Sequence, residues 1–148
     1  MRASFLAAFL FLVTAPALAG PFAGSDDFKT HLEFLGYTIE EGETSLLARH
    51  EHYYNVSVKS LGGGVLVATF FGTTDRAKSD RVGFLDFLNG MNRDAVAARY
   101  YEDEEGDVIV EGWYAGDYER SRFGVFVDRF NVISDQLGDS DVAPDYLE

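Results

Sequence analysis

Residues 79–113, SDRVGFLDFLNGMNRDAVAARYYEDEEGDVIVEGW, decide the fold of this chain. The first half places its apolar residues on one helical arc, about 160° wide at ~100° per residue. Ser79 or Asp80 is a suitable N-cap. After residue 94 the spacing changes to alternation, and Gly106 lies in an acidic turn between two alternating runs. The stretch therefore predicts a helix followed by a β-hairpin. The apolar residues of the helix are Phe84, Leu85, Phe87, Leu88 and Met91.

The sequence before this stretch predicts one helix and several strands. Residues 26–35 carry apolar side chains at helical spacing and end at Gly36, a good helix stop. Residues 65–71 are apolar on both faces, which predicts a central strand covered on both sides. Strands are expected at residues 37–40, 46–50, 54–59 and 65–71, with a turn at the three glycines 62–64.

The sequence after the hairpin predicts a long final helix. Its apolar stripe recurs every three or four residues from Phe123 to Leu137 and stops at Gly138, with Asp117 as the expected N-cap. Residues 139–148 are acidic and are expected to form a flexible tail. We therefore expect one α+β domain over residues 20–138, an antiparallel sheet flanked by three helices.

The first nineteen residues predict a cleaved signal peptide. Arg2 gives a positive start, residues 5–13 are apolar, and Ala17-Leu18-Ala19 is a small-x-small cleavage site. The alternative is a membrane-spanning helix. Such a helix needs ~20 apolar residues, and this apolar run is shorter. We expect a periplasmic or secreted protein with no stable membrane insertion after cleavage.

Composition narrows the classes of partner. The chain holds 25 acidic against 12 basic residues, which disfavours nucleic acid and anionic lipid surfaces. It has no cysteine, so this exported domain must be held by its core alone. The excess of negative charge suits a basic partner protein or a divalent cation as ligand. The alternative is that the acidic residues only keep the protein soluble.

No familiar catalytic pattern is present. The sequence has no cysteine, no Gly-x-Ser-x-Gly elbow, and no Lys-Ser/Thr pair after the glycines at 62–64 that would make a phosphate-binding loop. We therefore expect a protein that is not an enzyme and has no cofactor.

The arrangement resembles the YbjN family of bacterial proteins, which are labelled candidate sensory-transduction regulators. The resemblance lies in residues 87–92 (FLNGMN), in Tyr100-Tyr101 with Asp103 and the hairpin to Glu111, and in the step at residues 34–37 (FLGY). It implies a YbjN-like domain over residues 20–138 with a fold similar to type III secretion chaperones, a twisted antiparallel sheet flanked by helices. The family offers no established catalytic residues.

Two clusters are candidate metal sites. His50 and His52 lie at i and i+2 of a strand and can form half of a zinc site, with His31 or an acid as third ligand. The alternative is a solvated strand end. The acidic run at residues 102–107 has the composition of a calcium loop but not its ligand spacing, and a solvated hairpin tip is the alternative.

Candidate binding residues are aromatic or amide side chains. Exposure of Trp113 or Tyr114 beside Tyr53 or Tyr101 would mark a binding face, whereas a lone tryptophan is usually core. Asn89 and Asn92 are either a recognition pair or hydrogen-bond to helix-terminal and neighbouring strand backbone. We expect a chaperone-like or regulatory domain that binds a protein or peptide, with a homodimer as one form. The alternative is a periplasmic metal or small-ligand binding protein.

Overall fold

The computed structural model describes residues 20–148. Within that range one antiparallel sheet and five helices form a single α+β domain, as predicted. The expected signal peptide, residues 1–19, lies outside the described residues. The strands are β1 (Thr38–Glu41), β2 (Ser45–Arg49), β3 (Val56–Leu61), β4 (Gly64–Phe71), β5 (Ala98–Glu102) and β6 (Val108–Ala115). The helices are α1 (Ser25–Phe34), α2 (Asp75–Ser79), α3 (Arg81–Asp94), α4 (Arg120–Gly138) and α5 (Ala143–Tyr146).

The six strands lie in the order β1-β2-β3-β4-β6-β5, and every neighbouring pair is antiparallel. The β3–β4 turn uses Gly62 and Gly63 at φ 56° and 79°. A two-residue hairpin turn requires this left-handed region, and glycine adopts it without strain. β4 and β6 are paired along their whole length, so they form the centre of the sheet.

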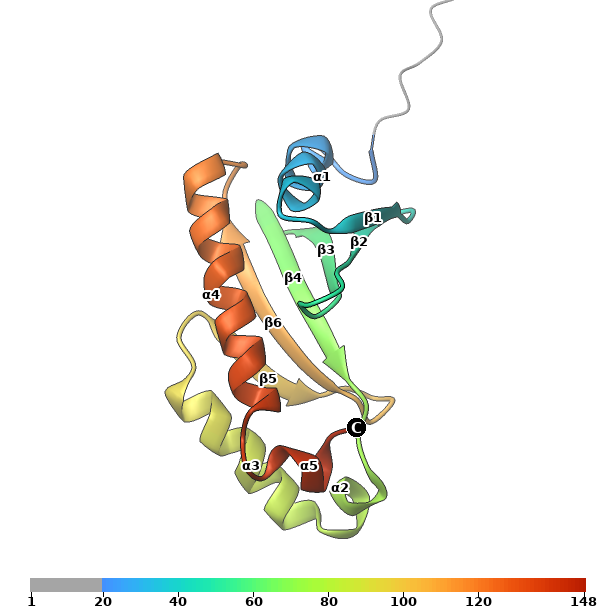
Figure 1. Cartoon of the computed structure of the whole chain (residues 1–148), viewed down its shortest axis with the longest axis vertical. Coiled ribbons are helices and arrows are strands. Elements are labelled where there is room, and N and C mark those ends of the chain that lie inside the picture. Colours follow the sequence, from blue (N-terminus) through green and yellow to red (C-terminus); the bar gives the residue numbers. More distant parts are fainter. Residues whose placement is uncertain (1–19) are drawn as a thin grey trace, which may run out of the picture.

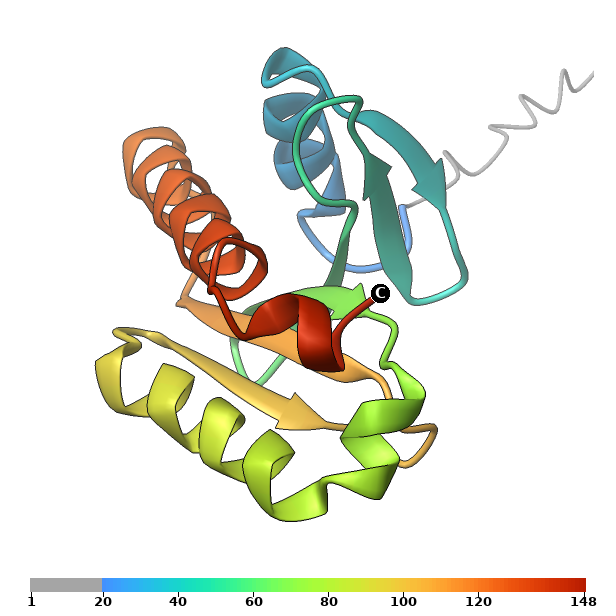
Figure 2. The same cartoon turned by 60° about the horizontal axis from the view of Figure 1, so that its bottom comes forward.

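One face of the sheet packs against the three long helices. Phe28 of α1, Phe84 of α3 and Phe130 of α4 join Val67 and Val110 of the central strands in one buried cluster. Helix α4 runs along the sheet, with α1 at one end of the molecule and α3 at the other (Figure 1). The sheet twists from β1 beside α1 to β5 beside α3 (Figure 2). The predicted three flanking helices are confirmed, and α2 and α5 are short additions.

Helix α3 begins where the sequence predicted. The Asp80 side chain accepts a hydrogen bond from the Gly83 N–H at 3.2 Å, which makes Asp80 the N-cap. Phe84 and Leu88 are buried in the core. Leu85, at the margin of the expected apolar arc, is 42% exposed instead.

Helix α4 begins two residues later than expected. The N-cap is Glu119 rather than Asp117: the Glu119 carboxylate accepts hydrogen bonds from the backbone N–H groups of Ser121 and Arg122. The two bonds lower the pKa of the Glu119 carboxyl, and the bond from Arg122 has the larger effect. Asp117 lies in the preceding loop, where its carbonyl accepts from the Tyr114 hydroxyl. Among residues 20–148 no helix combines the length and apolar character needed to cross a membrane.

The C-terminal residues are packed against the domain, so the expectation of a flexible tail over residues 139–148 is wrong for its second half. Ala143, Tyr146 and Leu147 are buried. The Tyr146 hydroxyl donates to the Asp80 carboxylate at 2.9 Å, and Leu147 forms a β-bridge with Thr73. The apolar spacing of these three residues gives the short helix α5 a face to bury.

The second face of β4 was predicted to be covered, and it remains largely open. Val65, Val67 and Thr69 point into the helix-covered core. On the other face no helix lies over the strand; Leu66 and Ala68 are buried, and Phe70 is 52% exposed. The continuous apolar run therefore reflects a sheet with one covered face and one apolar open face.

The outer edge of β5 is closed by an asparagine from α3. The Asn92 amide donates to the Tyr100 carbonyl at 2.7 Å, and its carbonyl accepts the Tyr100 N–H at 2.9 Å. The same amide donates to the Leu88 carbonyl in the last turns of α3 at 3.0 Å. Asn92 thus takes the two outward backbone groups of Tyr100, which an added strand would otherwise use.

We expect Asn92→Ala to lower the free energy of unfolding by about 1–3 kcal/mol, because it leaves the Tyr100 backbone pair without partners. Asn89→Ala is the matched control, since Asn89 is exposed on the same helix. Urea unfolding measures the stability, and light scattering tests whether the freed edge promotes self-association. Equal stability of the two variants would contradict the assigned role.

Candidate functional site

The candidate site is the open face, the surface of the sheet turned away from the core. Alternation along the paired strands places its side chains together although they come from five strands. Leu61 is 49%, Phe70 52% and Trp113 48% exposed. Large apolar side chains gathered on one surface are typical of an interaction site. The open face comprises Leu47, Ser57, Lys59, Leu61, Leu66, Ala68, Phe70, Arg99, Tyr101, Ile109, Glu111 and Trp113.

A shallow groove runs across the open face between the exposed aromatic side chains. One part, about 270 Å³, lies beside Trp113, and the other, about 100 Å³, lies beside Phe70 and Tyr101. Leu66 and Glu111 line both parts, which therefore lie next to each other. The surface of both parts is mostly apolar, which suits an apolar segment of a partner.

A buried carboxylate lies at the centre of the groove. Glu111 is 6% exposed, and Arg99 Nε donates to its Oε1 at 2.6 Å. The Tyr101 hydroxyl donates to Oε2 at 2.9 Å, while the Arg99 guanidinium lies 4.8 Å from the Tyr101 ring centre. Burial first, and then the bond to Glu111, raises the pKa of Tyr101. Both oxygens of the Glu111 carboxylate accept hydrogen bonds. Glu111, Arg99 and Tyr101 therefore fix the shape of the groove, and the carboxylate is not free to react.

The open face differs in charge from the rest of the chain. Its charged residues are Lys59, Arg99 and Glu111, and Glu111 is paired with Arg99. The whole chain carries a formal charge of −13. A partner can therefore approach this surface without the like-charge repulsion found elsewhere.

The four aromatic residues predicted to form a binding face do not lie together in the structure. Trp113 is exposed on the open face, where its indole N–H donates to the Leu61 carbonyl at 2.9 Å. Tyr101 lies on the same face. Tyr114 points the other way and is buried. Tyr53 is exposed in the β2–β3 loop against the His50 ring, so it does not join Trp113.

The two asparagines have different surroundings. Asn92 uses its amide on the backbone of α3 and β5, which is the second of the two predicted interpretations. Asn89 is exposed on α3. Neither residue lies on the open face.

The histidines do not converge. His50 Nδ1 accepts hydrogen bonds from the backbone N–H groups of His52 and Tyr53, at 2.9 and 3.1 Å, and thereby shapes the β2–β3 loop. In the described residues no group of three potential metal ligands contains His50 or His52. His31 is turned toward α4 and Tyr118 instead.

The acidic hairpin tip brings Asp103, Glu105 and Asp107 close together. Asp103 Oδ1 accepts three backbone N–H groups, those of Glu105, Gly106 and Asp107, at 2.9–3.0 Å. Gly106 has φ 95°, as the predicted turn requires. The carboxylate therefore stabilises the turn, and exposed acids of this kind are common without an ion.

Sequence reasoning missed Leu61, Leu66 and Phe70 as site residues. No local pattern marks them: only the strand register seen in the structure shows that Leu66 pairs with Trp113 and Phe70 with Ile109. An exposed Trp113 implies that its cross-strand neighbours face the same side.

The fold defined by this sheet and its helices is the YbjN-like, type III secretion chaperone-like α+β fold, which confirms the predicted resemblance at the level of structure. YbjN of E. coli, a candidate transcription regulator, is similar with a TM-score of 0.68 and 14% identity, over 84% of this chain and 96% of its own. A chain of the heterodimeric ExoU–SpcU complex from the type III secretion system of Pseudomonas aeruginosa gives a TM-score of 0.56 and 18% identity, over 80% and 96%. No family model and no curated protein matches the sequence.

His31 is a buried titratable side chain outside the candidate site. It is buried, and its Nδ1 lies 2.9 Å from the Tyr118 hydroxyl. Burial is the main cause that lowers the pKa of His31, and the positive charge of Arg120 lowers it further. The negative charge of Asp128 acts in the opposite direction. The folded state therefore binds a proton less readily than the unfolded chain.

We expect the free energy of unfolding to fall as the pH drops through the ordinary histidine pKa near ~6.5, because only the unfolded state gains the proton there. Above that pH both states are neutral at this site and the effect is absent. Urea unfolding between pH 8 and 5 measures it. His31→Gln should flatten the dependence and His52→Gln, at an exposed position, should not; identical slopes in all three proteins would refute the assignment.

Proposed function

We propose that this chain is a non-catalytic, chaperone-like or regulatory protein that binds a protein or peptide partner through the open face. One observation carries the proposal: Phe70 and Trp113 are half-exposed beside the groove, and Leu61 is half-exposed on the same face of the sheet, which no helix covers. The fold is similar to that of a chain from the ExoU–SpcU heterodimer, which supports a protein-binding role.

The partner should present an apolar segment with acidic or neutral flanks. Lys59 lies beside Leu66 in the sheet and Arg99 beside Glu111, so the groove is bordered by positive side chains. A second copy of the chain would present the same positive border, so a different protein with acidic or neutral flanks suits this face better than a homodimer does.

Replacing Phe70 and Trp113 by serine should abolish partner binding while leaving the fold intact, because both side chains are half-exposed and contribute little to the core. A pull-down from periplasmic extract, with light scattering of the protein alone, measures partner binding and self-association. The control is Val82→Ser with Val125→Ser, which removes two exposed apolar residues from α3 and α4. Partner recovery that is equal for both double variants would exclude the open face.

We also propose that the protein acts outside the cytoplasm after removal of residues 1–19. The support is the arrangement of Arg2, the apolar run 5–13 and the Ala17-Leu18-Ala19 site.

Expression in a Gram-negative host should give a periplasmic protein whose first residue is Gly20, and mass spectrometry of the intact chain measures this. Ala19→Arg should block cleavage, because the small residue before the cut is required. Ala23→Arg, beyond the site, is the control. Recovery of an uncleaved cytoplasmic chain from wild type would contradict export.

A further inference from the structure

A pocket of about 300 Å³ lies between helix α1 and the segment that leads into helix α4. Thr30, His31 and Phe34 of α1 line one side of it, and Tyr118 and Arg120 line the other. Its surface is mostly apolar, and its volume is at the lower end of the ~300–1,000 Å³ typical of small-ligand sites. None of these residues lies on the open face. We call this space the α1–α4 pocket.

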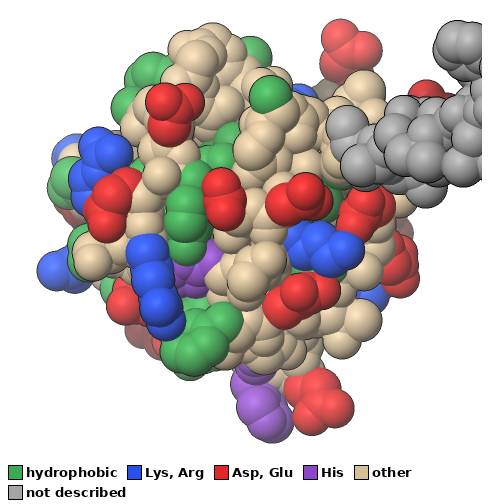
Figure 3. Space-filling model, turned by 90° about the horizontal axis from the view of Figure 1, so that it is seen from above, with side chains coloured by type: hydrophobic (Ala, Val, Ile, Leu, Met, Phe, Trp, Pro, Cys, Tyr) green, Lys and Arg blue, Asp and Glu red, His purple; other side chains and the backbone are tan. Residues whose placement is uncertain are grey.

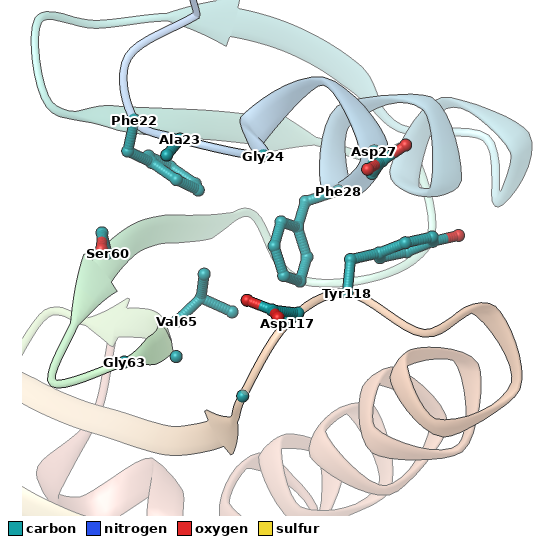
Figure 4. Close-up of a pocket in the computed structure, with 12 residues that line it drawn as sticks. Phe22, Ala23, Gly24, Asp27, Phe28, Ser60, Gly63, Val65, Asp117 and Tyr118 are labelled. Carbon is teal, nitrogen blue, oxygen red and sulfur yellow. The ribbon is translucent and has the colours of Figure 1, made fainter.

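Tyr118 lines both the α1–α4 pocket and a larger cavity of about 440 Å³. Its ring packs edge-on against the buried ring of Phe28, with the centroids 5.3 Å apart, and its hydroxyl points away from the larger cavity (Figure 4). That hydroxyl lies 2.9 Å from Nδ1 of His31. Phe28 and His31 therefore hold the Tyr118 side of the α1–α4 pocket in place.

The α1–α4 pocket contains a buried imidazole with one free nitrogen. His31 is 7% exposed, and its Nδ1 is engaged by the Tyr118 hydroxyl, whereas its Nε2 has no hydrogen-bond partner in residues 20–148. Nε2 is accessible, because no fully enclosed polar side-chain atom in the described part of the chain lacks a partner. Gly124 of α4 faces Nε2 and has no side chain to cover it: a Cβ at this position would lie 3.5 Å away.

A positive charge at the rim of the α1–α4 pocket is positioned but not neutralised. Cζ of Arg120 lies 5.2 Å from the centre of the Phe34 ring, which is a cation–π contact, and Phe34 is 72% exposed. Arg120 has no salt bridge among the described residues, whereas Arg122 is paired with Glu119. Seen from above, this end of the molecule has a hollow with histidine at its base and basic and hydrophobic side chains around it (Figure 3).

The charges that act on His31 favour an anion in the pocket, although the chain as a whole carries a formal charge of −13. Arg120 lowers the pKa of His31 and Asp128 raises it, and the effect of Arg120 is the larger of the two. No acidic residue lines the α1–α4 pocket. A negatively charged group is therefore better placed here than a cation.

We infer that the α1–α4 pocket binds a carboxylate carried on an apolar stem. The Arg120 guanidinium pairs with the carboxylate, and Nε2–H of His31 donates to it when the Tyr118 hydroxyl donates to Nδ1. The rings of Phe34 and Tyr118 contact the stem. A metal ion does not fit, because the lining residues offer a single imidazole and no carboxylate. A multiply charged anion does not fit either, because a mostly apolar surface supplies too few donors.

Two sources supply this chemistry: the C-terminal carboxylate of a peptide that ends in an apolar residue, and a free fatty acid. N-acetyl-leucine represents the first source and hexanoate the second. The inference does not rest on the proposed function, because Phe70 and Trp113 do not line the α1–α4 pocket. Binding is therefore measured on the protein alone, without any protein partner.

The experiment titrates the ¹⁵N-labelled protein with N-acetyl-leucine, with its uncharged analogue N-acetyl-leucinamide, and with hexanoate. Binding of a carboxylate should shift the amide signals of residues 30–34 and 118–124. Arg120→Gln should weaken binding about fivefold, because it removes the charge that pairs with the carboxylate, and added salt should weaken binding to wild type. Arg129→Gln, at an exposed position later in α4, is the matched control and should leave the affinity unchanged.

Binding of either carboxylate that is weakened by Arg120→Gln supports the site, and the relative affinity of the two probes identifies the source. The amide spectrum of the variant reports whether it is folded, and Phe34→Ala, at an exposed position, should weaken binding as well. Wild-type affinity in both variants, equal affinity for the uncharged analogue, or an absence of localised shifts with both carboxylates would overturn the proposal. The serine variant of Phe70 and Trp113 should bind the carboxylates as wild type does, which separates this site from the open face.

Discussion

The pairing of β4 with β6 is the constraint on which the rest of this structure depends. In its register Thr69 lies opposite Val110 and both point into the core, while Leu66 lies opposite Trp113 and both point to the open face. A shift by one residue would exchange the two sets, because side chains alternate along a strand. The helix-covered core and the candidate binding surface are therefore two consequences of one register.

The parts of the fold that repeat locally could be predicted from the sequence. The stripe of α4 and the helix and hairpin at residues 79–113 carry their own periodicity, and the Gly62–Gly63 turn carries its own chemistry. The open face was not predictable in the same way, since an apolar strand does not reveal what covers its second side. Alternation along β6 does place Trp113 and Tyr114 on opposite faces. Tyr114 lies on the same face as Val110, which is buried in the core.

Features that join distant segments could not be read from local pattern. Tyr146 reaches Asp80 across 66 positions, which explains why the acidic end of the chain is ordered against α3. A cavity of about 440 Å³ likewise combines Phe22, Val65 and Asp117 from three separate segments. At the start of α4 two acids, Asp117 and Glu119, were both chemically suitable caps, and only the path of the loop decides between them.

The boundaries of the sheet determine how a partner can reach it. At one edge Asn92 occupies the outward backbone groups of Tyr100. At the other edge β1 is only four residues long, and its carboxylates Glu40 and Glu41 are paired with Arg49 and Lys29. Short, charged or occupied edges resist the addition of a further strand. These edges therefore oppose the addition of a further strand, and the open face is the part of the sheet that offers side chains for contact.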